Sequence, residues 1–246
     1  NDGATDDAAL TRAVIQSAKS LGAQLKMPAE FISAIPGDDV NDIKYSVNGT
    51  IHSCKARLLV NTAGPWANAV LEKITPIPAK REFDLVSGAH IVLNESAPSG
   101  MYYVEAPQDQ RAVFVMPWKG KTMIGTTETV FSGNPSEVAP LPEEETYLCD
   151  VASSYFPKFK DLTREKIAES FAGLRVLPHA SGKPFSRPRE TTFHVDKKIA
   201  PRIATIYGGK LTVYRITAEK FVAKFSASLP RRKRKAETNK LPLTPI

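Results

Sequence analysis

The stretch from Ile203 to Arg215, IATIYGGKLTVYR, contains the transition that decides the fold. Its first five residues predict a strand, the two glycines that follow predict a turn, and a helical pattern begins at Leu211. Glycines after a strand let the backbone come close to a ligand, and a helix N-terminus presents N–H donors and positive charge. Lys210 adds a full positive charge there. We predict either a site for an anion or a carbonyl group, or an ordinary turn with a solvated lysine.

A second strand ends in small residues in the stretch LLVNTAGPWA, residues 58–67. The small side chains of Thr62, Ala63 and Gly64 permit a close approach to a cofactor. Pro65 is well placed for the first turn of a short helix. The alternative interpretation is a tight turn that ends a buried strand.

The order of the other segments indicates two interleaved subdomains. Residues 6–22 have helical spacing, and Asn48-Gly49 between two strand-like segments is a hairpin signal. After Pro78 come short β-rich runs parted by turns, which are typical of an antiparallel sheet, and a helix over 141–156. We therefore predict an α/β (α+β) fold, in which the two ends form an α/β part and a mostly antiparallel sheet domain is inserted between them.

The composition of the 246 residues, with 42% apolar and 24% charged residues, is that of a soluble globular protein, and no apolar run is long enough to span a bilayer. The net charge is +7, but residues 231–235 are all basic, and the remaining 28 basic and 26 acidic residues leave only +2. This run is interpreted as a solvated linker or, alternatively, as a contact for anionic lipid or nucleic acid. Cys54 and Cys149 are far apart and lack metal-ligand spacing, which indicates a reduced compartment; a single disulfide is the alternative.

Three cations and one histidine are candidates for chemistry. Arg175, Arg189 and Lys210 would form a phosphate pocket if they converged, because guanidinium groups bind phosphate oxygens bidentately. The alternative for each arginine is a surface ion pair. His90, in SGAHIVL, is a candidate for proton transfer, although a lone histidine among apolar neighbours also suits a structural role.

Taken together and in order, these segments resemble the flavin-dependent glycerol-3-phosphate dehydrogenases of the D-amino-acid-oxidase-like flavoprotein superfamily. The resemblance runs from near the start of the chain to about residue 225. It is carried by the stretches DDAALTRAVIQSAKSLGAQ, ARLLVNTAGPWA, VSGAHIVL, AVFVMPWKGKTMIGTTE, FAGLRVLP, SRPRE and YGGKLTVYR.

The resemblance implies FAD as cofactor and assigns roles to matching positions. Two segments match those near the flavin: Ala63, Gly64, Pro65 and Trp66, and Gly209, Lys210, Leu211 and Thr212. His90, Arg175, Arg189 and Lys210 match residues of the substrate pocket, with the cations on the phosphate; His90 and Arg175 are the catalytic candidates. The implied domains are a partial FAD-binding domain over 1–78 and 198–228, a substrate domain over 79–197 and a basic linker over 229–246.

The implied activity is oxidation of glycerol 3-phosphate to dihydroxyacetone phosphate by hydride transfer to FAD, with a quinone as the onward acceptor. The resemblance further implies a homodimer in the cytoplasm, peripherally attached to the membrane surface and without a nucleic-acid partner. A flavin-dependent oxidase of amines or 2-hydroxy acids is an alternative. A non-catalytic module that binds an anion or nucleic acid through residues 231–235 is a second alternative.

The chain also departs from the family pattern. The strand–GxGxxG–helix unit that opens the family and holds the ADP part of FAD occurs nowhere in the sequence. The family's C-terminal helical domain has no counterpart after PLTPI. We therefore expect this chain to be a fragment of the enzyme that, alone, is inactive and does not bind FAD tightly.

Overall fold

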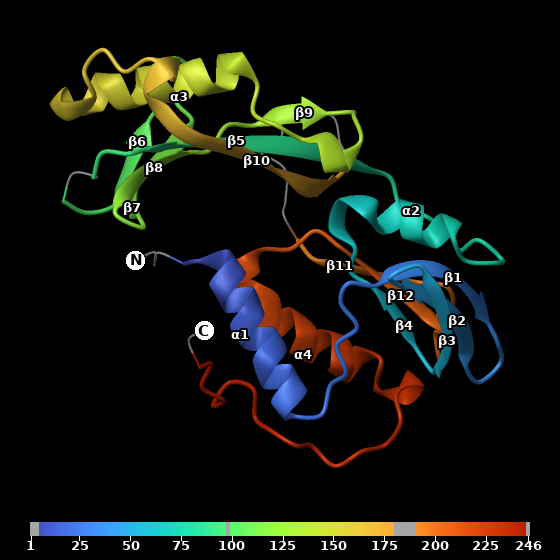
Figure 1. Cartoon of the computed structure of the whole chain (residues 1–246). Coiled ribbons are helices and arrows are strands. Elements are labelled where there is room, and N and C mark those ends of the chain that lie inside the picture. The colour runs from blue at the N-terminus through green and yellow to red at the C-terminus, as the bar shows by residue number, and fades with distance from the viewer. Residues whose placement is uncertain (1–4, 97–98, 180–189, 245–246) are drawn as a thin grey trace. The chain divides into compact units, whose positions relative to one another are not determined.

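The computed structural model describes residues 5–96, 99–179 and 190–244, and the chain divides into two compact units (Figure 1). Unit 1 contains Asn1–Arg81 and Arg189–Ile246, whereas unit 2 contains Glu82–Pro188. The two ends of the chain therefore build one unit, and the middle builds the other. Both units combine helices with strands, and antiparallel pairing predominates, which confirms the expected mixed α/β class.

Unit 1 is built from three helices and six strands of the described residues. They are α1 (Asp7–Ser20), β1 (Glu30–Pro36), β2 (Asn41–Val47), β3 (Thr50–Ala56), β4 (Leu59–Asn61), α2 (Ala67–Glu72), β11 (Thr192–Val195), β12 (Ile203–Tyr207) and α4 (Tyr214–Lys224). Strands β1, β2 and β3 form one antiparallel sheet, while β11, β12 and β4 form a second sheet. The expected hairpin joins β2 to β3, where Asn48 and Gly49 both have positive φ, as a tight hairpin turn requires.

The short sheet of unit 1 is covered on both faces, because β12 is buried along most of its length. Ala204 packs with Phe221 and Phe225 of α4, and the rings of these two phenylalanines lie 4.7 Å apart. Ile203, the next residue along β12, packs instead with Leu71 of α2 and with residues of the other sheet. Successive side chains of a strand point to opposite faces, so this one strand joins two small cores.

Strand β11 belongs with unit 1. It pairs antiparallel with β12, with Thr192 opposite Tyr207 and Val195 opposite Ala204. The sequence analysis assigned these residues to the inserted domain over 79–197, and those domain bounds stay a prediction. A short run such as TTFHV carries no signal for which strand it will pair with.

Unit 2 contains one helix and six strands of the described residues. They are β5 (Phe83–Leu93), β6 (Tyr102–Glu105), β7 (Ala112–Trp118), β8 (Lys121–Gly125), β9 (Thr129–Phe131), α3 (Pro142–Tyr155) and β10 (Ile167–Pro178). The sheet is antiparallel, with the order β10-β5-β8-β7-β6, and β9 pairs with β5. Strands β5 and β10 pair over nearly their whole length and form a long two-stranded ribbon.

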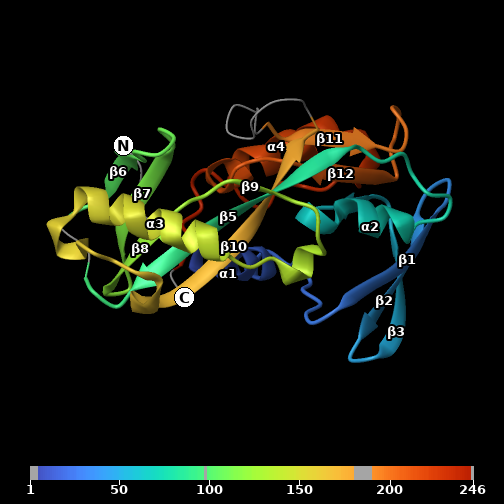
Figure 2. The same ribbon diagram turned by 90° about the horizontal axis from the view of Figure 1, so that it is seen from above.

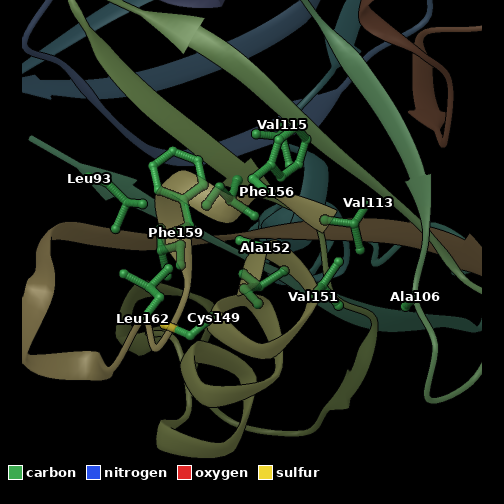
Figure 3. Packing of buried hydrophobic residues seen from close by; sticks show 13 residues of the cluster. Leu93, Ala106, Val113, Val115, Cys149, Val151, Ala152, Phe156, Phe159 and Leu162 are labelled. Atoms are coloured by element: carbon green, nitrogen blue, oxygen red, sulfur yellow. The ribbon is translucent and has the colours of Figure 1, made fainter. Parts of the chain in front are cut away.

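Helix α3 covers one face of this sheet (Figures 1 and 2). Val151 and Ala152 of α3 belong to one buried cluster with Val113 and Val115 of β7, and Cys149 lies beside Leu162 in the close view of the core (Figure 3). On β5, alternate residues such as Ile91 and Leu93 belong to the same buried cluster. Successive residues of a strand point to opposite faces, so His90, which directly precedes Ile91, points to the opposite face of the sheet, away from α3.

The N-terminus of α3 is fixed by the buried carboxylate of Glu144. It accepts hydrogen bonds from the Leu141 N–H at 3.0 Å and from the hydroxyls of Thr127 and Thr129, both at 2.7 Å. The Thr127 hydroxyl in turn accepts from the Ala89 N–H at 2.9 Å. A negative charge is favoured at the positive end of a helix, and these donors compensate for its burial. One carboxylate thus joins α3 to the segment after β8 and, through Thr127, to β5.

The basic run near the C-terminus contacts the end of α1 within unit 1. Lys235 donates from Nζ to the backbone oxygen of Leu21, just after α1, at 2.7 Å. A cation is favoured at the negative end of a helix. Among the described residues, no helix is long and apolar enough to cross a bilayer.

Glu145 on α3 gives a pH-dependent prediction. Its carboxylate accepts from the Ser170 hydroxyl on β10 at 2.7 Å and pairs with Arg164 at 2.8 Å, and these contacts hold its pKa below the ordinary value. The resulting stabilisation is fully present above the ordinary glutamate pKa of about 4.3 and is lost as pH falls through the lowered pKa of the folded protein. We expect Glu145→Gln to lower the free energy of unfolding by about 1–2 kcal/mol at pH 7 and by much less at pH 3.

Urea unfolding at pH 7 and pH 3 measures both values. Glu143→Gln, which changes an exposed carboxylate on the same helix, is the matched control. An equal loss at both pH values in Glu145→Gln would show that the charge on Glu145 is not what stabilises the fold.

Candidate functional site

Two glycine-containing turns leave the same edge of the short sheet in unit 1. Strands β4 and β12 run parallel, with Leu59 opposite Ile203 and Asn61 opposite Thr205. Beyond their carboxyl ends follow the segment of Ala63–Trp66 and the segment of Gly208–Lys210. The carboxyl edge of parallel strands is where α/β proteins place ligands. The structure therefore brings together two segments that the sequence analysis assigned to the cofactor.

The first turn, residues 63–66, is stabilised by hydrogen bonds of a buried asparagine. Asn61 accepts from the Ala63 N–H at 3.1 Å and donates to the Ala67 oxygen at 2.9 Å. Gly64 has a φ of 54°, and a Cβ added there would meet no atom within 4 Å. The outer side of the turn is therefore open, and Trp66 beside it is 44% exposed.

The second turn is also exposed. Gly208 and Gly209 have φ values of 71° and 104°, which favour glycine, and Lys210 is exposed. The helical pattern predicted from Leu211 begins as a 3₁₀ turn over Leu211–Val213, and α4 itself starts at Tyr214. The helix expected from Leu211 is therefore present, and only its first turn is 3₁₀. Such a 3₁₀ turn is common at the start of an α-helix.

These two turns fit the isoalloxazine ring system of a flavin. A flat aromatic ring needs a surface free of projecting side chains, and the open side of Gly64 provides one. The exposed backbone from Gly208 to Lys210 offers N–H donors and a positive charge to the ring's carbonyl edge. The residues present are therefore compatible with FAD.

In unit 2, His90 lies on the sheet face that is opposite to α3. Its ring stacks on Phe171 of β10, with 5.0 Å between the centroids and 8° between the planes. It also lies against Gly125 of β8, where an added Cβ would collide with the imidazole. Glycine at 125 and the aromatic neighbour together hold the ring flat against the sheet.

Arg175 lies on the same face, farther along the β5–β10 ribbon. Its guanidinium donates to the Thr126 hydroxyl at 3.1 Å and to the Thr127 oxygen at 3.3 Å, and it lies 3.6 Å from the Glu128 carboxylate. A Cβ added at Gly88 would lie 2.7 Å from Nη2. The Arg175 side chain is 24% exposed, so this fixed cation still faces solvent.

The structure brings some predicted residues together and leaves others apart or undescribed. His90 and Arg175 share one face of unit 2, whereas Lys210 and the Gly64 turn belong to unit 1. Arg189 lies outside the described residues. A convergence of Arg175, Arg189 and Lys210 on one phosphate therefore stays a prediction.

Sequence reasoning missed the groups that hold His90 and Arg175. They are Phe171, Thr126, Glu128, Gly88 and Gly125. Two motifs contained a signal for the two glycines. Gly125 is the first residue of GTTE, residues 125–128, and Gly88 is the glycine of SGAH. Neither motif shows that its glycine lies beneath a functional side chain, because the contacts join different strands.

A hollow of unit 2 lies away from these residues. It is lined by Gln108, Pro142, Glu143, Thr146, Tyr147 and Asp150. Burial and the hydrogen bond from its hydroxyl to Asp109 raise the pKa of Tyr147 to about 12, so this phenol stays protonated at neutral pH. No group of three or more metal-binding side chains was found in the part of the chain that the structure describes.

Comparisons with known proteins identify the family of the chain. The model of the family described as FAD dependent oxidoreductase matches residues 1–215. D-erythritol 1-phosphate dehydrogenase of Brucella abortus is 30% identical over 219 residues, which cover 87% of this chain and 43% of that protein. A glycerol-3-phosphate dehydrogenase of Pseudomonas aeruginosa is 32% identical over 223 residues, covering 89% and 43% respectively.

A solved structure is similar along almost the whole chain. The glycerol-3-phosphate dehydrogenase from Bacillus halodurans, complexed with FAD, superimposes with a TM-score of 0.77 and 29% identity, covering 98% of this chain and 45% of that one. This chain thus spans less than half the length of each of these three relatives. Because the family model matches most of its residues and relatives at 30% identity or more cover most of it, the chain belongs to the family of FAD-dependent oxidoreductases.

Proposed function

We propose that this chain forms part of a flavin-dependent dehydrogenase that oxidises a small polyol phosphate, with glycerol 3-phosphate as the first candidate. The observation that carries the proposal is the placement of His90 and Arg175 on one open face of the unit 2 sheet, each against a glycine. A proton acceptor and a fixed cation on one surface suit a substrate with an alcohol at one end and a phosphate at the other.

Arg175 would bind the phosphate. Its guanidinium is already oriented by Thr126, Thr127 and Glu128, so little conformational freedom is lost when an anion binds. Glu128 offsets part of its positive charge, which favours a second cation for a phosphate dianion. Arg189 and Lys210 are proposed for that role.

His90 would accept the proton of the substrate hydroxyl. An alcohol becomes a ketone by losing that proton together with a hydride from the same carbon. Bound FAD would supply the two-electron acceptor for this oxidation. The stack with Phe171 fixes the plane of the imidazole, so the ring is held for proton transfer before substrate arrives.

In unit 1, the two groups of residues that leave the carboxyl edge of the sheet are proposed to contact the flavin. Ala63, Gly64, Pro65 and Trp66 would lie along the ring system, and Gly209, Lys210, Leu211 and Thr212 along its carbonyl edge. Positive charge at that edge favours a reduced flavin, which carries more negative charge. We propose this electrostatic role for Lys210.

The wider setting is proposed from the same family resemblance. A quinone would reoxidise the enzyme, which would act as a homodimer at the cytoplasmic surface of a membrane, attached peripherally. The exposed arginines and lysines of residues 231–235 support an approach to anionic lipid.

The flavin contact at Gly64 is tested by adding one methyl group. Gly64→Ala places a Cβ in the open space where the ring would lie, at a φ of 54° that strains any side chain, so we expect about tenfold weaker FAD binding, or about 1.4 kcal/mol. Gly49→Ala is a matched control, since Gly49 also has positive φ and an equally open Cβ position. Titration of flavin fluorescence measures both affinities. Equal FAD affinities in the two variants would contradict this placement of the flavin.

The phosphate contact is tested by Arg175→Lys, which keeps the positive charge and removes the planar guanidinium. We expect KM for glycerol 3-phosphate to rise about tenfold, because a lysine cannot reproduce the bidentate geometry, while the slow oxidation of unphosphorylated glycerol changes little. Arg164→Lys alters an arginine that pairs with Glu145 instead, and it is the control. Reduction of an artificial dye by the FAD-loaded longer enzyme that is expected to contain this chain gives the rates. An equal loss of activity toward glycerol 3-phosphate and toward glycerol in Arg175→Lys would argue against a phosphate contact.

A further inference from the structure

One glycine of the open face in unit 2 has no structural reason to be a glycine. Gly173 lies within β10, midway between Phe171 and Arg175. Its φ is outside the left-handed range in which side chains are strained, and a Cβ built on it would meet no atom within 4 Å. Glycine weakens a strand relative to alanine. The fold of unit 2 would therefore accept a side chain at position 173.

The two glycines that neighbour Gly173 on this face behave differently. Gly88 lies directly opposite it on β5, and an added Cβ there would meet the Arg175 guanidinium. An added Cβ at Gly125 would meet His90. Those two glycines are explained by the side chains that cover them, whereas Gly173 is exposed and covered by none of the described residues.

The position of Gly173 relates it to the proposed substrate. A strand rises about 3.3 Å per residue, so the Cα atoms of Phe171 and Arg175 lie about 13 Å apart with Gly173 between them. Phe171 marks the location of His90, because the two rings stack and the two residues are directly paired. The Arg175 guanidinium reaches back to Gly88, level with Gly173, so it lies closer to His90 than the Cα positions suggest. A small molecule that touches both groups would lie beside them, over the uncovered backbone of Gly173.

We propose that Gly173 is the specificity-determining residue of this surface: its bare backbone is the floor on which the carbon chain of a polyol phosphate lies. This inference rests on the proposed function. Because position 173 has no side chain, it determines how bulky and how long the carbon chain of the substrate can be. The three-carbon and four-carbon polyol phosphates named in the two relatives differ in this dimension.

The test compares Gly173→Ala and Gly173→Val with the wild type. Ala168→Val adds bulk at an exposed position of the same strand and is the matched control. Steady-state dye reduction by the FAD-loaded longer enzyme that is expected to contain this chain gives kcat/KM for glycerol 3-phosphate and for D-erythritol 1-phosphate, and inorganic phosphate serves as a competitive inhibitor. In the protein without added flavin, the NMR signals of the His90 ring report binding of the same three compounds.

We expect Gly173→Ala to fold with unchanged or higher thermal stability. Its kcat/KM should fall about tenfold for the substrate that the wild type prefers and further for the longer polyol, and Gly173→Val should lose more, since one extra carbon is worth roughly 10–200-fold in discrimination. Inhibition by inorganic phosphate, which needs Arg175 but no carbon chain, should stay within about twofold of the wild type.

Three outcomes would overturn the inference. If phosphate inhibition weakens as much as kcat/KM, position 173 acts through Arg175 instead of on the carbon chain. If both substrates retain wild-type kinetics in Gly173→Val, the surface above Gly173 is not where the substrate lies, although the proposed function stands. If the wild type oxidises neither polyol phosphate and none of the three compounds shifts the His90 signals, the proposed function fails and this inference fails with it.

Discussion

The carboxylate of Glu144 is the contact on which the arrangement of unit 2 depends. It binds the start of α3 and the hydroxyls of Thr127 and Thr129, and Thr127 in turn holds both β5 and the Arg175 guanidinium. Removing this carboxylate would leave several buried donors without their acceptor, which costs more than the loss of one hydrogen bond. The candidate cation is therefore held by the same network that joins the helix to the sheet.

Much of the fold could be predicted from local patterns. The hairpin at Asn48 and Gly49, the helix after Pro142 and the antiparallel runs of the middle segment all follow from signals within a few residues. The parallel pairing of β4 with β12 could not be predicted in this way, since it joins segments more than 140 residues apart. Its effect is to place the two glycine turns at one edge.

The candidate site was predictable as a set of residue types but not as an arrangement. His90, Arg175 and Lys210 were found from their motifs, yet no motif shows that an ion pair with Glu128 holds one of them or that Phe171 stacks on another. These contacts depend on strand register, which the hydrophobic pattern fixes only once the partner strand is known. Their proposed roles, like those of Arg189 and the residues near the flavin, stay predictions.

The long pairing of β5 with β10 fixes the distance between the residues that these strands carry. His90 and Arg175 are carried by two strands in fixed register, so their separation changes only in steps of two residues, or about 6.6 Å. A shift of one residue would turn one of them toward α3 and out of reach. A finer adjustment of the space between His90 and Arg175 therefore requires a change in the side chains that lie between them, while the register of β5 and β10 is preserved.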